Sequence, residues 1–189
     1  TYADRLYLEM NRHGYDEPTW FTFSYSPVRD ESGRIAGMYC ACVEVTEQVL
    51  KCVYAELYEA RCFLEGTVLK PNMVVPGKKS GQKASPEQVA AQTVRLFKQT
   101  VPVAVPGIAF LSGGQSDEEA TANLDAINKI GNLPWSVTFS YGRALQAAPQ
   151  KAWAGKKENV AAAQKAFSHR AKMNGVAARG EWKKALEAA

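Results

Sequence analysis

The chain has 189 residues, a length that suits one ordinary domain or two small ones. Hydrophobic residues make up 46% of it, which favours a folded protein with a core over a disordered one. No apolar run approaches the ~20 residues of a membrane-spanning helix, and the first residues lack the charged-then-apolar pattern of a secretory signal. We therefore expect a cytoplasmic protein that does not act at a membrane.

Charge divides the chain into two unequal parts. Residues 1–48 carry 4 Arg and 8 acidic residues, a net charge of −4, whereas residues 49–189 carry 19 basic and 11 acidic residues, a net charge of +8. No lysine precedes Lys51. This break predicts two segments of different origin, a first domain over 1–48 and a second over 49–189. The basic second part suits an anionic substrate, although solvated surface lysines would explain it as well.

Cysteine spacing argues against a zinc site. The four cysteines lack a paired C-x-x-C spacing, and both histidines lie far from them in sequence. We expect reduced and mostly buried thiols and no metal, with metal binding as the alternative. The cysteines are Cys40, Cys42, Cys52 and Cys62.

The first segment is typical of antiparallel strands. Trp20–Ser26 alternates aromatic with small polar residues, and Pro27 ends this strand. Arg29–Gly33 has turn chemistry, and Ile35–Val45 follows as a second strand, so the two strands are expected to form a hairpin. Thr46 is then expected to cap a helix.

After residue 50 the pattern alternates between strand and helix. Two helices carry capping boxes at their starts, Ser85 to Gln88 and Ser116 to Glu119, with ends expected near Gln99 and Ile130. Further helical sequence runs from about Lys157 to Met173. This alternation predicts parallel βα units, in a barrel or an open α/β sheet. The strands are expected at Phe63–Lys70, Gly107–Leu111 and Trp135–Ser140.

Lys70 is the first candidate for chemistry. Alternation along Phe63–Lys70 places it at the end of a mostly apolar row, at the C-terminal end of a strand, where (β/α)8 barrels build active sites. A neutral amine in an apolar, partly dry site can attack a carbonyl and form a Schiff base. The alternative is a surface lysine that closes a strand, which is common.

Loops after the next two strands suit an anion. Gly113 and Gly114 allow close approach of the backbone, and the capped helix that follows points its first amides toward the loop. Gly142 again allows close approach, and Arg143 offers a planar fork that matches phosphate. The alternatives are an ordinary glycine turn and an Arg143 that forms a salt bridge on the first helical turn.

Three stretches resemble the class I, Schiff-base fructose-bisphosphate aldolases: Leu64–Val74, Phe110–Ser116 and Thr138–Gln146. Lys151–Trp153 and Gly155–Asn159 continue the resemblance. The motifs are long, stand in the family's order and spacing, and extend the match over about 140 residues. The resemblance implies an α/β fold, a partial (β/α)8 TIM barrel made of the last three of eight βα units. The antiparallel β-hairpin expected in the first segment precedes it.

The same resemblance implies the reversible cleavage of fructose 1,6-bisphosphate to dihydroxyacetone phosphate and glyceraldehyde 3-phosphate. Lys70 is implied as the catalytic Schiff-base residue, with no metal and no cofactor. The expected partner is a phosphorylated sugar and not nucleic acid, and a homo-oligomer is a possible assembly. The residues implied to bind the substrate phosphate are Ser112, Gly113, Ser140, Gly142 and Arg143.

Residues 1–48 resemble the C-terminal half of a PAS sensor domain. The resemblance is carried by Trp20–Asp30, Gly33–Gly37 and the exit Glu44–Glu47, which in that family leads into a signalling helix. Two alternatives to an active lyase follow. One is a non-catalytic chimeric fragment, since the first five strands of the barrel family have no counterpart here. The other is a PAS-type sensory or signalling module.

Overall fold

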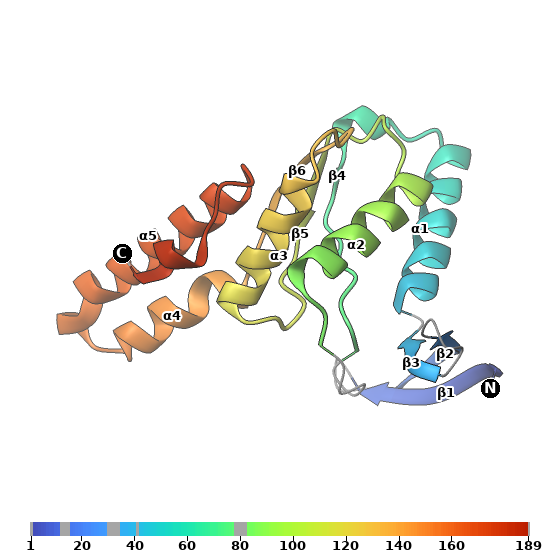
Figure 1. Cartoon of the computed structure of the whole chain (residues 1–189), viewed down its shortest axis with the longest axis horizontal. Helices are drawn as coiled ribbons and strands as arrows, with labels where there is room; N and C mark the ends of the chain where they lie inside the picture. The colour runs from blue at the N-terminus through green and yellow to red at the C-terminus, as the bar shows by residue number, and fades with distance from the viewer. Residues whose placement is uncertain (1, 12–15, 30–34, 41, 78–82, 189) are drawn as a thin grey trace.

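The computed structural model describes residues 2–11, 16–29, 35–40, 42–77 and 83–188. These residues form two separate three-stranded sheets, one antiparallel and one parallel, together with five α-helices and three short 3-10 helices. In Figure 1, helix α1 lies at one end of the helical part and the pair α4 and α5 lies at the other, with α2 and α3 between them.

The antiparallel sheet is made of β1 (Tyr2–Asn11), β2 (Asp16–Arg29) and β3 (Ile35–Cys40), in that order. Both neighbouring pairs run antiparallel, and β1 is a strand that the sequence analysis did not expect. The second expected strand ends at Cys40 and not at Val45. Residues 30–33 of the expected turn lie outside the described residues, and a PAS-like character of this sheet stays a prediction.

Helix α1 (Cys42–Glu59) begins four residues before the expected cap at Thr46, so that prediction is wrong. The helix contacts α2, and it buries Leu50 and Tyr54 in the core. Other apolar residues of the helix are only partly covered or exposed. Leu57 is half-buried, whereas the exposed ones are Val49, Val53 and Tyr58.

The parallel sheet has the order β4 (Val68–Leu69), β5 (Gly107–Phe110) and β6 (Ser136–Phe139). Val68 pairs with Gly107, and Gly107 pairs with Ser136, so all three strands run in the same direction. The expected α/β fold with parallel βα units is confirmed. The expected strand over Phe63–Lys70 is mostly wrong, because Leu64–Gly66 forms the 3-10 helix η1 and only two residues join the sheet.

Helices α2 (Pro86–Thr100) and α3 (Asp117–Lys129) begin where the capping chemistry predicted. At both starts a serine hydroxyl accepts the backbone N–H three residues later, and the side chain at that position accepts the serine N–H in return. These reciprocal bonds satisfy two of the four unpaired donors at each helix start.

Helix α4 (Arg143–Trp153) begins at the residue that the sequence analysis placed, as an alternative, on a first helical turn, and it carries Pro149 in its interior, a residue that normally breaks a helix. Packing against α5 (Val160–Ala177) compensates for the missing hydrogen bond, since these two helices lie side by side (Figure 1). The expected helix start at Lys157 is the 3-10 helix η2 (Lys157–Asn159). The chain closes with η3 (Lys184–Ala188).

The core lies between one face of the parallel sheet and helices α2 and α3. Ile108 and Phe110 of β5 are 0% and 1% exposed, and the Phe110 ring stacks on Phe97 of α2 with ring centres 5.7 Å apart. The alternate residues Gly107 and Ala109 are only half-buried, so the other face of β5 is less covered. Within the described residues, no helix combines the length and the apolarity needed to cross a bilayer.

Candidate active site

The C-terminal ends of the three parallel strands lie side by side. The N–H of Leu111, after β5, donates to the carbonyl of Pro71, after β4, at 3.0 Å. The N–H of Ser140, after β6, donates to the carbonyl of Phe110 at 2.8 Å. The structure therefore brings the segments that carry Lys70, the glycine pair and Arg143 to one edge of one sheet, as parallel βα units do.

The backbone that follows Lys70 is firmly anchored. Met73 and Val74 are buried, and the N–H of Val74 donates to the hydroxyl of Thr93 on α2 at 3.0 Å. The amide oxygen of Asn72 accepts the N–H of Met73 at 3.0 Å. Lys70 thus extends from a fixed backbone, although its own side chain is exposed.

The exposure of Lys70 contradicts the dry apolar setting that the sequence analysis expected. The expectation assumed a long strand whose apolar residues form a wall next to the amine. Instead β4 has two residues, and Val68, the apolar neighbour nearest in the assumed row, is 65% exposed. Within the described chain, Lys70 is a solvent-accessible amine at a strand end.

The loop after β5 has the backbone form that an anion site requires. Gly113 and Gly114 have φ angles of 58° and 83°, a region that favours glycine. A Cβ on Gly113 would lie 2.2 Å from Oδ1 of Asn72, so a larger residue would force the Asn72 side chain to move. Among the residues that the structure describes, the N–H groups of Ser112, Gly113 and Gly114 find no hydrogen-bond partner. Consecutive free amides of this kind form anion-binding concavities.

Two residues that the sequence analysis did not single out hold this loop. Gln115 donates twice to the carbonyl of Ser112, from its backbone N–H at 3.0 Å and from Nε2 at 2.9 Å. Asn123 of α3 donates from Nδ2 to Oε1 of Gln115 at 2.6 Å. A signal was present, because Asn123 is a polar residue on a helix face otherwise made of Ala120 and Ile127.

The end of β6 is anchored by Tyr141. Its ring is buried, its hydroxyl donates to the carbonyl of Ala120 at 2.8 Å, and burial raises the pKa of the Tyr141 phenol. Ser140 before it is half-buried, whereas Gly142 and Arg143 after it are exposed. The tyrosine therefore fixes the position from which the last two residues reach solvent.

Arg143 is available for an external anion. It is the first residue of α4, where the backbone N–H groups lack intrahelical partners. Within the described part of the chain it forms no ion pair, so the alternative of a salt bridge on the first turn is wrong. A Cβ on Gly142 would meet no atom within 4 Å, which leaves open space beside the loop.

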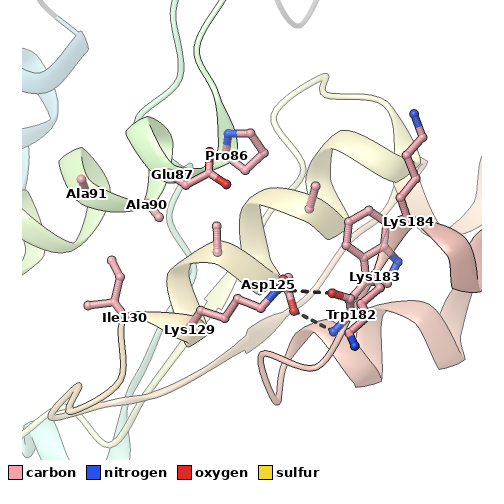
Figure 2. A pocket seen from close by; sticks show the side chains of 12 residues that line it. Pro86, Glu87, Ala90, Ala91, Asp125, Lys129, Ile130, Trp182, Lys183 and Lys184 are labelled. Carbon is pink, nitrogen blue, oxygen red and sulfur yellow. Dashed lines mark hydrogen bonds and ion pairs between the residues drawn. The ribbon is translucent and has the colours of Figure 1, made fainter.

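A pocket of about 510 Å³ lies elsewhere, between α2, α3 and the C-terminal segment (Figure 2). None of the six predicted site residues lines it. Its buried carboxylate, Asp125, is already engaged, since it accepts the N–H of Trp182 at 2.8 Å and pairs with Lys129 at 2.5 Å. Figure 2 shows these groups gathered where α3 meets the C-terminal segment. The pocket is therefore separate from the candidate site.

The cysteines differ from expectation where they are described. Cys52 and Cys62 are exposed, so the prediction of buried thiols is wrong for these two. In the described ranges, no group of three or more His, Cys, Asp or Glu side chains is arranged to hold a metal ion.

Two family models match the chain. The model of fructose-bisphosphate aldolase class-I matches residues 38–189, which include the parallel sheet and all the candidate site residues. A model of the PAS fold matches residues 5–50, which include the antiparallel sheet except the first three residues of β1, and the start of α1. The two matches overlap over residues 38–50.

Curated relatives agree with the first of these matches. The chain is 59% identical over 143 residues to cytosolic fructose-bisphosphate aldolase 4 of Arabidopsis thaliana and 58% identical over 140 residues to fructose-bisphosphate aldolase 2 of Caenorhabditis elegans. It is 56% identical to the fructose-bisphosphate aldolase of Drosophila melanogaster. These matches cover 74–75% of this chain, which spans only 36–38% of the length of the relatives.

A solved structure shows the same likeness in three dimensions. The fructose-bisphosphate aldolase of Plasmodium falciparum, crystallised with TRAP and a small-molecule inhibitor, is 50% identical and superposes with a TM-score of 0.74. The superposition covers 76% of this chain and 41% of that one.

Proposed function

The chain belongs to the fructose-bisphosphate aldolase class-I family, and from that premise we propose that Lys70 forms a Schiff base with a phosphorylated ketose. The reaction is the reversible cleavage of fructose 1,6-bisphosphate to dihydroxyacetone phosphate and glyceraldehyde 3-phosphate. Most of the barrel of the relatives lies outside this chain, so the proposal concerns the chemistry that the last three βα units contribute.

The chemistry begins at the amine. The lone pair of Nζ of Lys70 attacks the ketone carbon, and the carbonyl oxygen leaves as water when the carbon–nitrogen double bond forms. The protonated imine then accepts the electron pair of the carbon–carbon bond one carbon away, as the hydroxyl on the departing carbon gives up its proton, so the aldehyde leaves and an enamine remains. A proton added to the enamine carbon restores the imine, and its hydrolysis releases the ketone phosphate and the amine. No step in this sequence requires a metal.

The observation that carries the proposal is the adjacency of the three strand ends. Lys70 leaves the sheet beside a loop whose Ser112, Gly113 and Gly114 amides are unpaired among the described residues, and the exposed Arg143 follows the next strand. Free amides and a guanidinium are the groups that grip phosphate, while the amine one strand away reaches a carbonyl on the same small molecule. We assign phosphate binding to Ser112, Gly113, Ser140, Gly142 and Arg143.

Imine formation and bond cleavage make different demands. The imine requires only groups that this edge of the sheet carries, whereas cleavage also requires proton transfer, which positioned acids and bases accelerate by about 10²–10⁴-fold. The resemblance places those groups in the strands that have no counterpart here. We therefore propose that this chain alone cleaves the substrate much more slowly than a full-length relative.

A coupled assay of fructose 1,6-bisphosphate cleavage tests the proposal. We expect slow turnover that the Lys70→Gln substitution abolishes and that EDTA leaves unchanged. The Lys129→Gln variant is the matched control, since Lys129 lines the separate pocket, and it should retain the wild-type rate. Turnover that survives Lys70→Gln, or that EDTA removes, would contradict the proposed chemistry. A chain that binds substrate without any cleavage would instead support the non-catalytic fragment.

We also propose a cytoplasmic location and the division into residues 1–48 and 49–189. The name of the Arabidopsis relative, a cytosolic aldolase, supports the location. The PAS fold match over residues 5–50 supports a first segment of separate origin.

The PAS match also favours a second candidate function, a sensory or signalling role for the first segment. A sensor of this type holds a small chromophore or cofactor. An absorbance spectrum of the purified chain, before and after addition of a flavin or haem, measures that directly. Saturable binding of the chromophore would support the sensory role. If the absorbance of bound chromophore does not appear even at high ligand concentration, the sensory role would be contradicted.

A further inference from the structure

We propose that Gln115 is a positioning residue that sets the direction of the Gly113 amide for substrate phosphate, and that Asn123 holds Gln115 in the orientation this requires. The inference rests on the proposed function, because it concerns how the same loop recognises a phosphorylated ketone. Neither residue touches the reacting atoms.

One planar trans peptide joins the carbonyl of Ser112 to the N–H of Gly113, so these two groups point in opposite directions. Gln115 binds this carbonyl through two donors, its own N–H at 3.0 Å and its Nε2 at 2.9 Å. Fixing the carbonyl toward Gln115 therefore fixes the Gly113 N–H on the far side of the peptide, away from Gln115.

Such a constraint matters at this place because the loop has little intrinsic rigidity. Gly113 and Gly114 both have positive φ angles, and glycine populates many other conformations at low cost. An amide that must meet a phosphate oxygen gains from being held in its bound orientation before the ligand arrives. The side-chain bond from Gln115 supplies that restraint from outside the loop.

Asn123 decides which end of the Gln115 amide faces the loop. Its Nδ2 donates to Oε1 of Gln115 at 2.6 Å, so the Nε2 of Gln115 is left to face the Ser112 carbonyl. Asn123 is 7% exposed and sits on α3, a helix anchored by its capping box, so its own position is rigid. Nε2 also lies 3.8 Å from the sulfur of Met73, which follows Lys70, and this contact ties the loop to the Lys70 segment.

The test compares two ketones that differ only in phosphate. Borohydride traps the imine on Lys70 as a stable amine, and the trapping rate is measured with dihydroxyacetone phosphate and with dihydroxyacetone, both below saturation. The wild-type chain should be trapped faster by the phosphorylated ketone. In Gln115→Met, which keeps the side-chain length but removes the amide, we expect this preference to fall roughly tenfold, the effect of losing one oriented hydrogen bond.

Controls separate positioning from general damage. Gln88→Met makes the same chemical change in the capping box of α2, outside the loop, and should keep the wild-type preference. Asn123→Leu should lower the preference in the same direction as Gln115→Met, because the Gln115 amide is then free to turn. In all variants the rate with dihydroxyacetone should stay near that of the wild type, since that ketone makes no phosphate contact.

Each outcome decides one question. A loss confined to the phosphorylated ketone supports the positioning role. An unchanged preference in Gln115→Met, or an equal loss with both ketones, would overturn that role and leave Lys70 as the imine-forming residue. A wild-type chain trapped on Lys70 equally fast by both ketones would overturn phosphate recognition by the loop, and the role of Gln115 with it.

Discussion

The strand-end loops and the C-terminal part of the chain use their polar groups in opposite ways. At the C-terminal part, Nη1 of Arg170 donates both to Glu187 and to the Thr121 hydroxyl, each at 3.0 Å. Nη2 of Arg170 also pairs with the Glu187 carboxylate. Trp182 donates from its indole to Glu187 at 2.9 Å. We use the name C-terminal clamp for the group of Thr121, Arg170, Asn174, Trp182 and Glu187. At the strand ends, by contrast, Lys70 and Arg143 are exposed and unpaired among the described residues.

The difference shows that the C-terminal clamp stabilises the fold, whereas the strand-end loops keep polar groups free to bind a ligand. In the clamp, the buried donors and acceptors satisfy one another except Nδ2 of Asn174, which has no partner among the described residues, and these bonds hold η3 and α5 against α3. Groups that bind a ligand must be left without intramolecular partners, so they contribute less to the stability of the fold. Substitutions in the clamp should therefore affect unfolding, whereas substitutions at the strand ends should affect binding more than stability.

The largest expected effect is the loss of the buried guanidinium. Arg170→Met removes one partner of an ion pair whose side chains are 8% and 10% exposed, and leaves the Glu187 charge partly buried and uncompensated. We expect the free energy of unfolding to fall by about 3 kcal/mol. Urea denaturation measures it.

The matched control is Arg179→Met, whose ion pair with Glu181 has side chains 60% and 61% exposed. Arg179→Met should lower the free energy of unfolding by less than ~1 kcal/mol. Equal costs for the two variants would show that burial does not distinguish the clamp from the surface.

The next effect concerns a glycine at the strand ends. Gly113→Ala forces a side chain into a backbone conformation with a φ of 58° and against the amide of Asn72. We expect a loss of about 2 kcal/mol in the free energy of unfolding, within the range for a strained residue. Phosphate binding, followed by the amide signals of the loop in NMR spectra, should weaken as well.

Gly175→Ala is the control, because it should raise the free energy of unfolding where Gly113→Ala lowers it. This glycine lies inside α5, and a Cβ on it would meet no atom within 4 Å. Alanine should stabilise the helix by about 0.5–1 kcal/mol. A stabilising Gly113→Ala would mean that the described loop conformation is wrong.

A smaller effect is expected at the helix that follows the loop. Ser116→Ala removes the hydroxyl that accepts the Glu119 N–H and breaks the capping box of α3. The cost should be about 1 kcal/mol in thermal or urea unfolding. Ser168→Ala, at an exposed position within α5, should change stability by less than ~0.5 kcal/mol. Similar values at the two serines would argue against the capping box.

The smallest effect is a pH dependence of the clamp. Burial raises the pKa of Glu187, but hydrogen bonds from Arg170 and Trp182, the Arg170 charge and the contact with His169 outweigh it, so the net pKa lies below the ordinary 4.5. A carboxyl with a lowered pKa stabilises the fold above its ordinary pKa, and this contribution is lost as pH falls through the folded-state value.

The comparison of wild type with Glu187→Gln isolates that contribution. The stability advantage of the wild type should be constant from about pH 6 to 8 and should shrink below the ordinary carboxyl pKa of 4.5. An advantage that stays constant down to pH 3 would contradict the lowered pKa of Glu187.

The parts of the fold that local chemistry determines could be predicted from the sequence. The two capping boxes located α2 and α3, and short apolar runs located β5 and β6 to within a residue or two. The parallel direction of these strands followed from the alternation of strands and helices. These features depend on neighbours in sequence, so the sequence alone was sufficient.

Features that depend on distant neighbours were missed or wrong. Phe63–Lys70 is rich in strand formers, but only two of its residues find a partner strand, and the short strand leaves Lys70 exposed. Helix α4 forms despite Pro149 because α5 packs along it. Tertiary contacts decide both of these features. The link from Asn123 to the loop through Gln115 spans only eight residues, and its one signal in the sequence was a polar residue on a helix face that is otherwise apolar.

The central claim is that Lys70 bonds covalently to a phosphorylated ketone, and reductive trapping tests it most directly. Folded protein is treated with dihydroxyacetone phosphate and borohydride, digested, and the peptides are weighed by mass spectrometry. We expect one adduct, on Lys70, which excess inorganic phosphate suppresses and which Lys70→Gln lacks. Protein without an adduct on Lys70, or with equal labelling of exposed lysines such as Lys183, would contradict it.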